Sequence, residues 1–264
     1  MTTTTDLSSL KCLVTGASSG IGQATCKVLT HYGATVVGIG RSEPALQEMK
    51  QAGSILDYVV ADITVDGECA RMVQEAVTKL GGSLTTVVNG AGGLRGGAIG
   101  SADLDNYYYN MRLNCQAPFE VIHAAVPFLK QQSHLHPSIV TVSSVNGKQS
   151  FPGCATYCMS KAAVDQLTRC ASLDLAKDGI RVNAVNPGVI KTNLHKASGM
   201  SDEAYQAFLN RSIEVTHPLA ASLGRVGQPE EVAELIAFLV SDKAKFLTGE
   251  CIAIDGARQN LGAR

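Results

Sequence analysis

Short runs of apolar, often β-branched residues alternate with longer amphipathic segments along the chain. A short continuous apolar run is typical of a strand buried on both faces, and apolar residues three or four positions apart are typical of a helix. The runs predict strands at 11–15, 35–39, 56–61, 84–89, 138–143, 180–186 and 251–254. The amphipathic spacing predicts helices at 20–32, 43–51, 67–80, 102–112, 117–132, 156–177 and 230–240.

This alternation predicts an α/β fold with a doubly wound parallel sheet and helices on both faces, because parallel strands need crossover helices. No linker, repeat or low-complexity run divides residues 1–264, which favours a single domain. Residues 192–224 interrupt the alternation with a polar stretch that contains Ser and Met. Such an insertion near strand ends is a candidate lid over a ligand site, and a pair of surface helices is the alternative.

Charge and hydropathy exclude several classes of protein. With 22 Lys and Arg against 23 Asp and Glu, the chain lacks the basic surface expected of a protein that binds nucleic acid or an anionic membrane. The longest apolar run, 235–240, is far too short to span a bilayer, and residues 1–10 lack the basic start and apolar core of a signal peptide. We therefore expect a cytoplasmic protein with neither a nucleic-acid nor a membrane partner.

The cysteines lack the CxxC spacing of zinc and redox sites, so we expect no metal. Two of them are one helical turn apart, which is too few ligands for a four-coordinate site. Their apolar or helical surroundings favour buried, reduced thiols in a reducing compartment. They are Cys12, Cys26, Cys69, Cys115, Cys154, Cys158, Cys170 and Cys251.

A glycine-rich turn follows the first predicted strand and opens the first predicted helix. Glycines at such a turn let the backbone approach a pyrophosphate, which the helix N-terminus then stabilises. A purely structural tight turn is the alternative, although the position after the first strand of a parallel pattern favours dinucleotide binding. The residues expected to contact the cofactor here are Gly16, Ser18, Ser19, Gly20, Ile21 and Gly22.

At this turn the chain resembles the classical short-chain dehydrogenase/reductase family, whose fingerprint TGxxxGIG matches residues 15–22. Further matches follow in order as far as Gly256, so the resemblance covers nearly the whole chain. It implies a single-domain Rossmann fold with a seven-stranded sheet, and an oxidoreductase that uses NAD(H) or NADP(H).

The end of the second predicted strand bears on which dinucleotide is bound. An acidic residue there usually meets the 2′-hydroxyl of NAD, whereas the 2′-phosphate of NADP needs a cation. Arg41 and Ser42 can bind a phosphate, so NADP(H) is favoured and NAD(H) is the alternative. Many NADP-using relatives also carry a cation in the glycine turn, where this chain has Ser19, and Arg41 could instead stack on the adenine. By resemblance Asp62, followed by Ile63, would contact the adenine, although Asp62 could equally cap the next helix.

Tyr157 and Lys161 form a YxxxK motif on a predicted helix, where positions i and i+4 share one face. A nearby ammonium is expected to lower the pKa of the phenol from about 10, so that it exchanges protons near neutral pH. Ser144 ends the preceding strand, where a hydroxyl can stabilise charge on a carbonyl oxygen. The resemblance makes Ser144, rather than Ser143, the catalytic serine, and it adds Asn114 to complete a Ser-Tyr-Lys-Asn tetrad.

Two other segments match the family. Residues 89–92 are similar to the family's NNAG motif, with Gly90 in place of the second Asn, and residues 187–192 are similar to its PG motif and following Thr. By resemblance these segments border the cofactor together with the Tyr and Lys of YxxxK. The residues concerned are Asn89, Gly90, Ala91, Tyr157, Lys161, Pro187, Gly188, Val189, Ile190 and Thr192.

The resemblance implies reversible hydride transfer between a nicotinamide and the carbon of a small carbonyl compound or secondary alcohol. NADP(H) would favour carbonyl reduction, with a 3-oxoacyl, steroid, sugar or xenobiotic ketone as substrate. The alternatives are an NAD-dependent alcohol dehydrogenase, a non-catalytic NADP(H)-binding sensor or scaffold, and a non-redox lyase on the same fold. The intact tetrad and glycine turn argue against the last two.

Substrate contacts are expected from loops near the strand ends and from the candidate lid. These candidates are Leu94, Arg95, Asn146, Gln149, Phe151, Leu194, His195, Tyr205 and Phe208. Relatives commonly form tetramers, so we expect a homotetramer, with a dimer as the alternative. Small and apolar residues on the predicted helix 156–177 suit such a contact, although a monomer core looks similar: Ala162, Ala163, Leu167 and Ala171.

Overall fold

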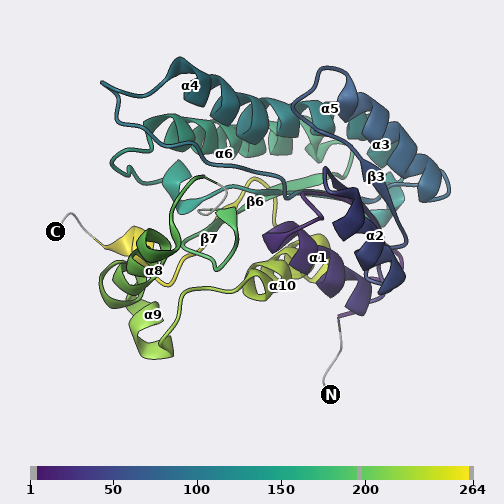
Figure 1. Ribbon diagram of the computed structural model, residues 1–264. Coiled ribbons are helices and arrows are strands. Elements are labelled where there is room, and N and C mark those ends of the chain that lie inside the picture. The colour runs from purple at the N-terminus through teal and green to yellow at the C-terminus, as the bar shows by residue number, and fades with distance from the viewer. Residues whose placement is uncertain (1–4, 195–197, 262–264) are drawn as a thin grey trace.

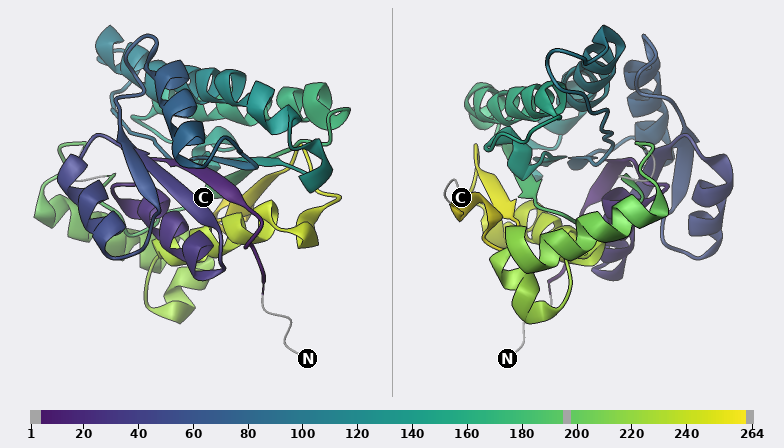
Figure 2. Two further views of the ribbon diagram at one scale, coloured as in Figure 1. Left: turned by 90° about the vertical axis from the view of Figure 1, so that its right-hand side faces the viewer. Right: turned by 60° about the vertical axis from the view of Figure 1, so that its left-hand side comes forward.

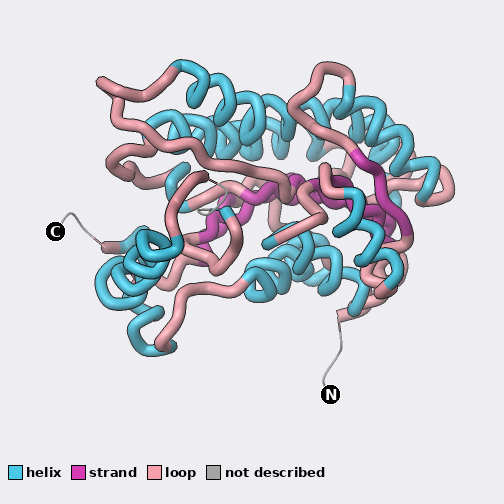
Figure 3. Tube along the Cα trace, viewed as in Figure 1, coloured by secondary structure: helices cyan, strands magenta, loops and turns pink. Residues whose placement is uncertain are grey.

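A parallel sheet forms the centre of the molecule in the computed structural model, which describes residues 5–194 and 198–261 (Figure 1, Figure 3). Its strand order is β3-β2-β1-β4-β5-β6-β7. The order reverses between β1 and β4, where an open α/β sheet offers a crevice for a ligand. The strands are β1 (Lys11–Thr15), β2 (Thr35–Gly40), β3 (Asp57–Val60), β4 (Thr86–Asn89), β5 (Ser138–Val142), β6 (Arg181–Pro187) and β7 (Cys251–Ile254).

Helices cover both faces of this sheet (Figure 1, Figure 2). Strand β1 shows how: Cys12 and Val14 belong to the core packed by α1, α2 and α10, whereas Leu13 belongs to the core packed by α3, α5 and α6. Side chains alternate along a strand, so a sheet covered twice needs apolar residues at every position. The helices are α1 (Gly20–His31), α2 (Glu43–Gln51), α3 (Glu68–Lys79), α4 (Leu104–Met111), α5 (Ala117–Lys130), α6 (Ala155–Ala176) and α10 (Pro229–Val240).

The predicted fold class, a doubly wound parallel α/β sheet, is confirmed, and most element ends differ from the prediction by a residue or two. Strands β3, β4 and β5 are shorter than the predicted segments 56–61, 84–89 and 138–143. Residues just outside them still bond to the neighbouring strand: Ala61 N donates to Gly40 O (3.0 Å) and Ser143 N donates to Val185 O (2.8 Å). The apolar pattern therefore extends slightly beyond the regular ladder.

The predicted helices 102–112 and 117–132 are parts of one interrupted helix. Helix α4 begins at Leu104, after the Asp103 carboxylate accepts a hydrogen bond from Asp105 N (3.0 Å). A π-helical turn, Arg112–Gln116, then joins α4 directly to α5. Such turns insert one extra residue into a helix and are frequent at functional sites.

The segment 192–224 contains two further helices, α8 (Asp202–Arg211) and α9 (Pro218–Leu223), with a second π-helical turn between them at Ser212–Thr216. Tyr205 and Leu209 of α8 pack with Val189, which follows β6, in a small apolar cluster. The segment is thereby held against the chain that leaves the C-terminal end of β6.

All the cysteines are free thiols, but the burial expected of them holds fully only for Cys12, Cys26 and Cys69. Cys170 is exposed because it lies on the outer face of α6, and Cys251 is half-buried on the edge strand β7. Within residues 5–194 and 198–261, no helix is long and apolar enough to cross a membrane.

Arg181 of β6 binds the C-terminal end of α10. Its guanidinium, in a residue that is only 6% exposed, donates to the carbonyls of Leu239 (2.6 Å), Val240 (3.3 Å) and Ser241 (3.3 Å). The last carbonyls of a helix have no partner within it. We expect Arg181→Met to lower the free energy of unfolding by about 2 kcal/mol, because the buried oxygens lose their donor.

Denaturant unfolding measures this change. Lys27→Met, at an exposed position of α1, is the control and should shift the free energy of unfolding by less than about 0.5 kcal/mol. If Arg181→Met were as stable as the wild type, the guanidinium would not be the cap of α10.

Candidate active site

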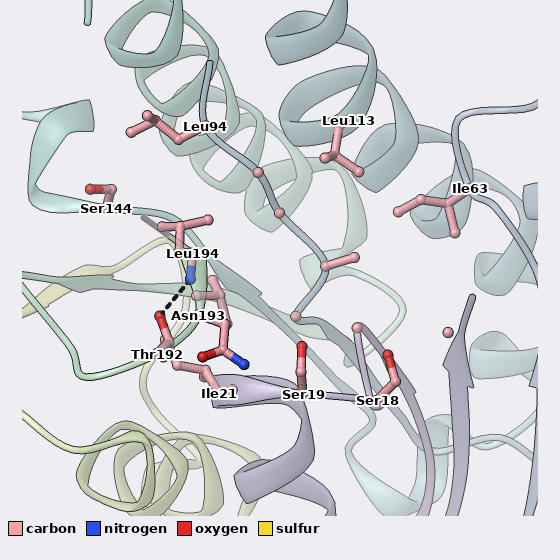
Figure 4. A pocket seen from close by; sticks show the side chains of 18 of the residues that line it. Ser18, Ser19, Ile21, Ile63, Leu94, Leu113, Ser144, Thr192, Asn193 and Leu194 are labelled. Atoms are coloured by element: carbon pink, nitrogen blue, oxygen red, sulfur yellow. Dashed lines mark hydrogen bonds between the residues drawn. The ribbon is translucent and has the colours of Figure 1, made fainter. Parts of the chain in front are cut away.

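A cavity of about 340 Å³ opens where the strands end (Figure 4). Ser18, Ser19 and Ile21 of the turn after β1 lie on one side of it, and Leu94 and Leu113 lie on the other. Most of the residues predicted to bind the cofactor or to react line this one cavity. They are Gly16, Ser18, Ser19, Gly20, Ile21, Arg41, Asp62, Ile63, Gly90, Ala91, Ser144, Tyr157, Lys161, Pro187, Gly188, Ile190 and Thr192.

Some predicted residues do not line the cavity. Gly22 packs inside the turn, Ser42 precedes α2 as its N-cap, and Asn89 is 2% exposed and donates to Thr141 Oγ1 (3.4 Å). These three residues are absent from the cavity lining, and their contact with the cofactor stays a prediction. Val189, also predicted to contact the cofactor, and Asn114, predicted as the fourth member of the tetrad, do not line the cavity either.

The glycine turn brings bare backbone to the cavity. Gly16 and Gly20 have φ of 70° and 54°, the left-handed region that glycine adopts readily. A Cβ on Gly16 would lie 2.7 Å from Ala91 N, and one on Gly22 would overlap the Gly16 carbonyl oxygen. Helix α1 begins at Gly20, so the amides of its first turn lie at the cavity wall and offer an anion site. This geometry fits the pyrophosphate of a dinucleotide.

Arg41 and Asp62 lie at the end of the cavity nearest β2 and β3. Their side chains approach to 3.9 Å and are 74% and 39% exposed, so the ion pair is weak. Asp62 Oδ1 accepts hydrogen bonds from Thr64 N (2.9 Å) and Thr64 Oγ1 (2.7 Å). Partial burial opposes ionisation, but these bonds and the Arg41 charge outweigh it and lower the pKa of Asp62. Asp62 thus both caps the next turn and lines the cavity.

Tyr157 and Lys161 of α6 face Ser144, which follows β5, at the other end of the cavity. All three are at least nine-tenths buried, at 6%, 4% and 9% exposed. Lys161 Nζ donates to the carbonyl of Val142 (2.9 Å) and lies 5.8 Å from the centre of the Tyr157 ring. Ser144 Oγ accepts from Asn146 N (3.1 Å), which leaves its own proton available to donate.

Burial dominates the ionisation of these groups. It raises the pKa of Tyr157 to about 12, although hydrogen bonding by Ser144 opposes the shift. It lowers the pKa of Lys161 to about 8, against the pull of the Asp165 carboxylate. The expectation that Lys161 brings the phenol pKa below 10 is therefore wrong for the protein alone, because burial disfavours the charged form of the phenol.

Asn114 sits in the π-helical turn between α4 and α5 and is 1% exposed. Its side chain pairs with Gly93, donating to the carbonyl (2.9 Å) and accepting from the N–H (3.0 Å), and it also donates to Ser160 Oγ (3.2 Å). A Cβ on Gly92 would lie 3.3 Å from Asn114 Oδ1 and 3.5 Å from Lys161 Nζ. Asn114 therefore ties the loop after β4 to α6 close to the lysine.

In the segment 187–192, at the end of β6, side chains from Val189 on alternate between the cavity and the opposite side. Ile190 and Thr192 line the cavity, and Thr192 Oγ1 accepts from Leu194 N (3.3 Å, dashed in Figure 4). Val189 does not line the cavity. Its side chain packs against α8, and its N–H donates to Nε2 of the buried His217 (3.0 Å).

The predicted substrate contacts divide into two groups. Leu94 and Leu194 line the cavity, and His195 lies outside the described residues. Arg95 lies instead over the Tyr109 ring, 3.9 Å from its centre, and Tyr205 donates from its hydroxyl to the Thr192 carbonyl (3.2 Å). Asn146, Gln149, Phe151 and Phe208 also lie away from the cavity lining.

Sequence reasoning missed other lining residues. Gly40, Thr64 and Gly93 lie at or after strand ends, so their positions in the sequence could have indicated that they line the cavity. Tyr109 and Leu113 reach it from α4 and the π-helical turn, and no sequence pattern indicates that. Also lining it are Ile39, Ala61, Gly92, Val142, Ser143, Asn193 and Ser198. In the described part of the chain, no three His, Cys, Asp or Glu side chains are grouped to hold a metal ion.

Known proteins share this arrangement over nearly their whole length. A family model described as "Enoyl-(Acyl carrier protein) reductase" matches residues 16–257. The 3-oxoacyl-(acyl-carrier-protein) reductase FabG of Thermotoga maritima is 35% identical over 249 residues, 93% of this chain and 96% of the relative. A tropinone reductase homolog of Arabidopsis thaliana is 33% identical over 255 residues, 95% of this chain and 91% of the relative.

A solved short-chain dehydrogenase/reductase of unknown function from Caenorhabditis elegans, with cofactor, has a TM-score of 0.87 and 32% identity over 97% of each chain. This chain belongs to the classical short-chain dehydrogenase/reductase family. It is an oxidoreductase that acts between a carbonyl and a CH–OH group with NAD(P).

One departure of this short-chain dehydrogenase/reductase from the family pattern has a steric reason. At position 90 the chain has Gly, where the NNAG motif has its second Asn. A Cβ at Gly90 would lie 2.6 Å from the Thr15 carbonyl oxygen. In this chain the loop after β4 thus passes too close to β1 for a side chain.

The buried lysine predicts a pH-dependent stability. Because the pKa of Lys161 is about 8 when folded and 10.5 ordinarily, the unfolded chain holds more of the proton between these values, and the free energy of unfolding rises with pH there. From about pH 8 to about pH 9.5, we expect the wild type to gain roughly 1.5 kcal/mol relative to Lys161→Met. Tyr157 does not contribute below about pH 10, since its unfolded pKa is about 10.

Denaturant unfolding at both pH values gives this difference, with the exposed Lys177→Met as control. A gap between the wild type and Lys161→Met that stays constant with pH would mean that the folded lysine is not perturbed.

Proposed function

We propose that this enzyme is an NADP(H)-dependent carbonyl reductase that converts a small ketone to a secondary alcohol. The observation that carries the proposal is the convergence of Ser144, Tyr157 and Lys161 at one end of a cavity whose other end holds Arg41. Between the two ends lies the glycine turn, whose bare backbone would hold a pyrophosphate. The cavity thus offers, in order, the contacts that a dinucleotide and a carbonyl substrate need.

Arg41 supports NADP(H) over NAD(H). Its side chain is 74% exposed at the cavity rim and forms a weak pair with Asp62, so it can turn to a 2′-phosphate at small cost. A guanidinium binds phosphate oxygens bidentately. Ser42 occupies the N-cap position of α2 next to it, is exposed, makes no cap hydrogen bond, and would be the second donor.

The end of the cavity that holds Ser144, Tyr157 and Lys161 is its chemical end, and these residues have separable roles. NADPH, when bound, supplies the hydride. The Ser144 hydroxyl donates a hydrogen bond to the substrate oxygen and stabilises the charge that develops on it. The Tyr157 hydroxyl then gives its proton to that oxygen, and its raised pKa keeps it protonated at neutral pH.

Lys161 and Asn114 serve the tyrosine. Lys161, with a pKa of about 8, is largely charged at neutral pH and lies beside the ring, so it favours the tyrosinate that forms when the proton leaves. Asn114 fixes the loop at Gly93 and the adjacent α6 through Ser160. We propose that it keeps the lysine in place and continues the path for proton return.

We further propose that segment 192–224 is a lid. Asn193, Leu194 and Ser198 line the cavity from it, and α8 packs on Val189 at its base. Closure over the substrate would exclude water from the chemical end. A lid of this kind suits a small ketone with an apolar flank, since Leu94, Leu113 and Leu194 lie around the site.

A homotetramer, or a dimer, is proposed as the assembly. Of the face expected from the sequence, Ala171 is buried and Leu167 packs against the core of the subunit, whereas Ala162 is exposed and Ala163 is half-buried. Exposed apolar side chains on the outer faces of α5 and α6 support a contact there instead. They are Phe119, Met159 and Leu173.

The cofactor preference is tested with Arg41→Ala. We expect the dissociation constant for NADPH to rise about tenfold or more, because a charge-assisted phosphate contact is lost, and that for NADH to stay within about threefold. Fluorescence titration of purified protein measures both, with the exposed Arg169→Ala as control. Tight NADH binding that is insensitive to the substitution would favour an NAD-dependent alcohol dehydrogenase. Failure to bind either nucleotide would contradict the proposal and favour the non-redox lyase, because the sensor or scaffold would also bind NADP(H).

The proton-transfer roles are tested with Tyr157→Phe and Ser144→Ala. We expect kcat for a small ketone to fall by roughly 10³ for Tyr157→Phe and roughly 10² for Ser144→Ala, as for loss of a general acid and of an oxyanion donor. NADPH affinity should hardly change, since neither substitution alters the glycine turn. If Tyr157→Phe kept wild-type kcat, another group would be the acid.

A further inference from the structure

His217 is buried at the junction of three segments that are distant in sequence. It is 3% exposed and lies between the π-helical turn Ser212–Thr216 and helix α9. Its ring reaches Val189 in the segment after β6, and a Cβ on Gly188 would lie 2.8 Å from Nε2. Gly188 also approaches Asp255, in the segment after β7, within 2.9 Å by the same measure. The ring thus fills a space that only glycine at position 188 leaves open.

The hydrogen bonds fix which nitrogen carries the proton. Val189 N–H points at Nε2 at 3.0 Å, so Nε2 must be the acceptor. The ring proton is therefore on Nδ1, which lies 3.2 Å from the Ser212 carbonyl and 2.9 Å from Thr216 Oγ1. Neutral His217 satisfies a donor on one side and an acceptor on the other.

Charged groups around the ring are consistent with this neutral form. Burial, helped by the nearby Arg258 guanidinium and opposed by the Ser212 carbonyl and the Asp255 carboxylate, lowers the pKa of His217 to about 4. Arg258 Nη1 also donates to Thr216 Oγ1 (3.3 Å). His217 consequently accepts the Val189 bond throughout the neutral pH range.

The hydrogen bond from Val189 to His217 holds the segment after β6, which borders the chemical end of the cavity. In this extended segment, Val189 turns toward α8 and Ile190 lines the cavity. The far side is held by Gly227, whose N–H donates to Val189 O (3.2 Å) and whose carbonyl accepts from Lys191 N (2.9 Å). His217 thus holds the peptide before Val189, whereas Gly227 holds the peptides on both sides of Ile190, so the backbone at Ile190 has a set orientation.

We propose that His217 is a positioning residue for cofactor binding: by accepting the Val189 N–H, it fixes the Ile190 peptide against which the nicotinamide end of the dinucleotide binds. The inference rests on the proposed dinucleotide site and adds a residue that lines no part of the cavity. It also ties that peptide to the base of the segment 192–224, because the other ring nitrogen bonds to Ser212.

The test compares His217→Gln with His217→Asn, because the two amide side chains place their polar atoms near different nitrogens of the histidine ring. Gln at position 217 can place its carbonyl oxygen near the site of Nε2 and accept from Val189, whereas Asn reaches only as far as Nδ1. We expect His217→Gln to bind NADP⁺ within about threefold of the wild type, and His217→Asn to bind about tenfold more weakly, since the Val189 donor is left unpaired. Calorimetric titration at pH 7.5 gives the dissociation constants, and His31→Gln and His31→Asn at an exposed position of α1 are controls.

A second readout detects the bond itself. In the ¹⁵N-labelled protein, a scalar coupling between the Val189 amide nitrogen and His217 Nε2 is expected in the wild type. Equal affinities of His217→Asn and wild type would overturn the inference, and so would equal weakening by Gln and Asn, since the ring alone would then matter. If the wild type bound neither NADP⁺ nor NAD⁺, both the proposed function and the inference would be wrong. If the wild type bound NADP⁺ and His217→Asn bound it equally well, only the inference would be wrong.

Discussion

The close passage of two backbone segments at the switch between β1 and β4 is the constraint on which the site depends. Thr15 Oγ1 accepts hydrogen bonds from the N–H groups of Gly90 (3.1 Å) and Ala91 (3.2 Å), although these residues are far away in sequence. The approach leaves no room for a Cβ at Gly16 or Gly90. The floor of the cavity is therefore bare backbone, which is what a pyrophosphate and a flat ring system can lie against.

The chemical end depends on a different balance, that of charge and burial. Lys161 is fixed by the Val142 carbonyl, and Asn114 holds the neighbouring loop through Gly93. In such a poorly solvated place each charge interacts strongly with its neighbours, because water screens little. Lys161 has a pKa of about 8 and Tyr157 a pKa of about 12, so at neutral pH the lysine is largely charged and the phenol is protonated. When the phenol gives up its proton, the nearby ammonium would stabilise the tyrosinate.

Much of this could be read from the sequence because it depends on local spacing. Tyr157 and Lys161 share a face through the helix repeat, and the glycine turn follows directly from its place after β1. Contacts between distant segments left no such pattern. Nothing local shows that Tyr109 reaches the cavity, that the helix at Asn114 has a π-helical turn, or that Val189 turns away from the cavity to His217. The phenol pKa was misjudged for the same reason, since burial is a property of the packed fold.

The two ends of the cavity consequently differ in how freely they can change. Arg41 follows β2, is exposed and pairs weakly with Asp62, so its substitution would change the proposed phosphate contact with little effect on the fold. The segment around Ile190 is held by Gly227 on one side and by His217 on the other. We expect a change at either of these partners to move the peptide that borders the proposed nicotinamide site. In the proposed mechanism, selectivity for the nucleotide would therefore vary independently of the fold, whereas the geometry of hydride transfer would depend on the segment 192–224.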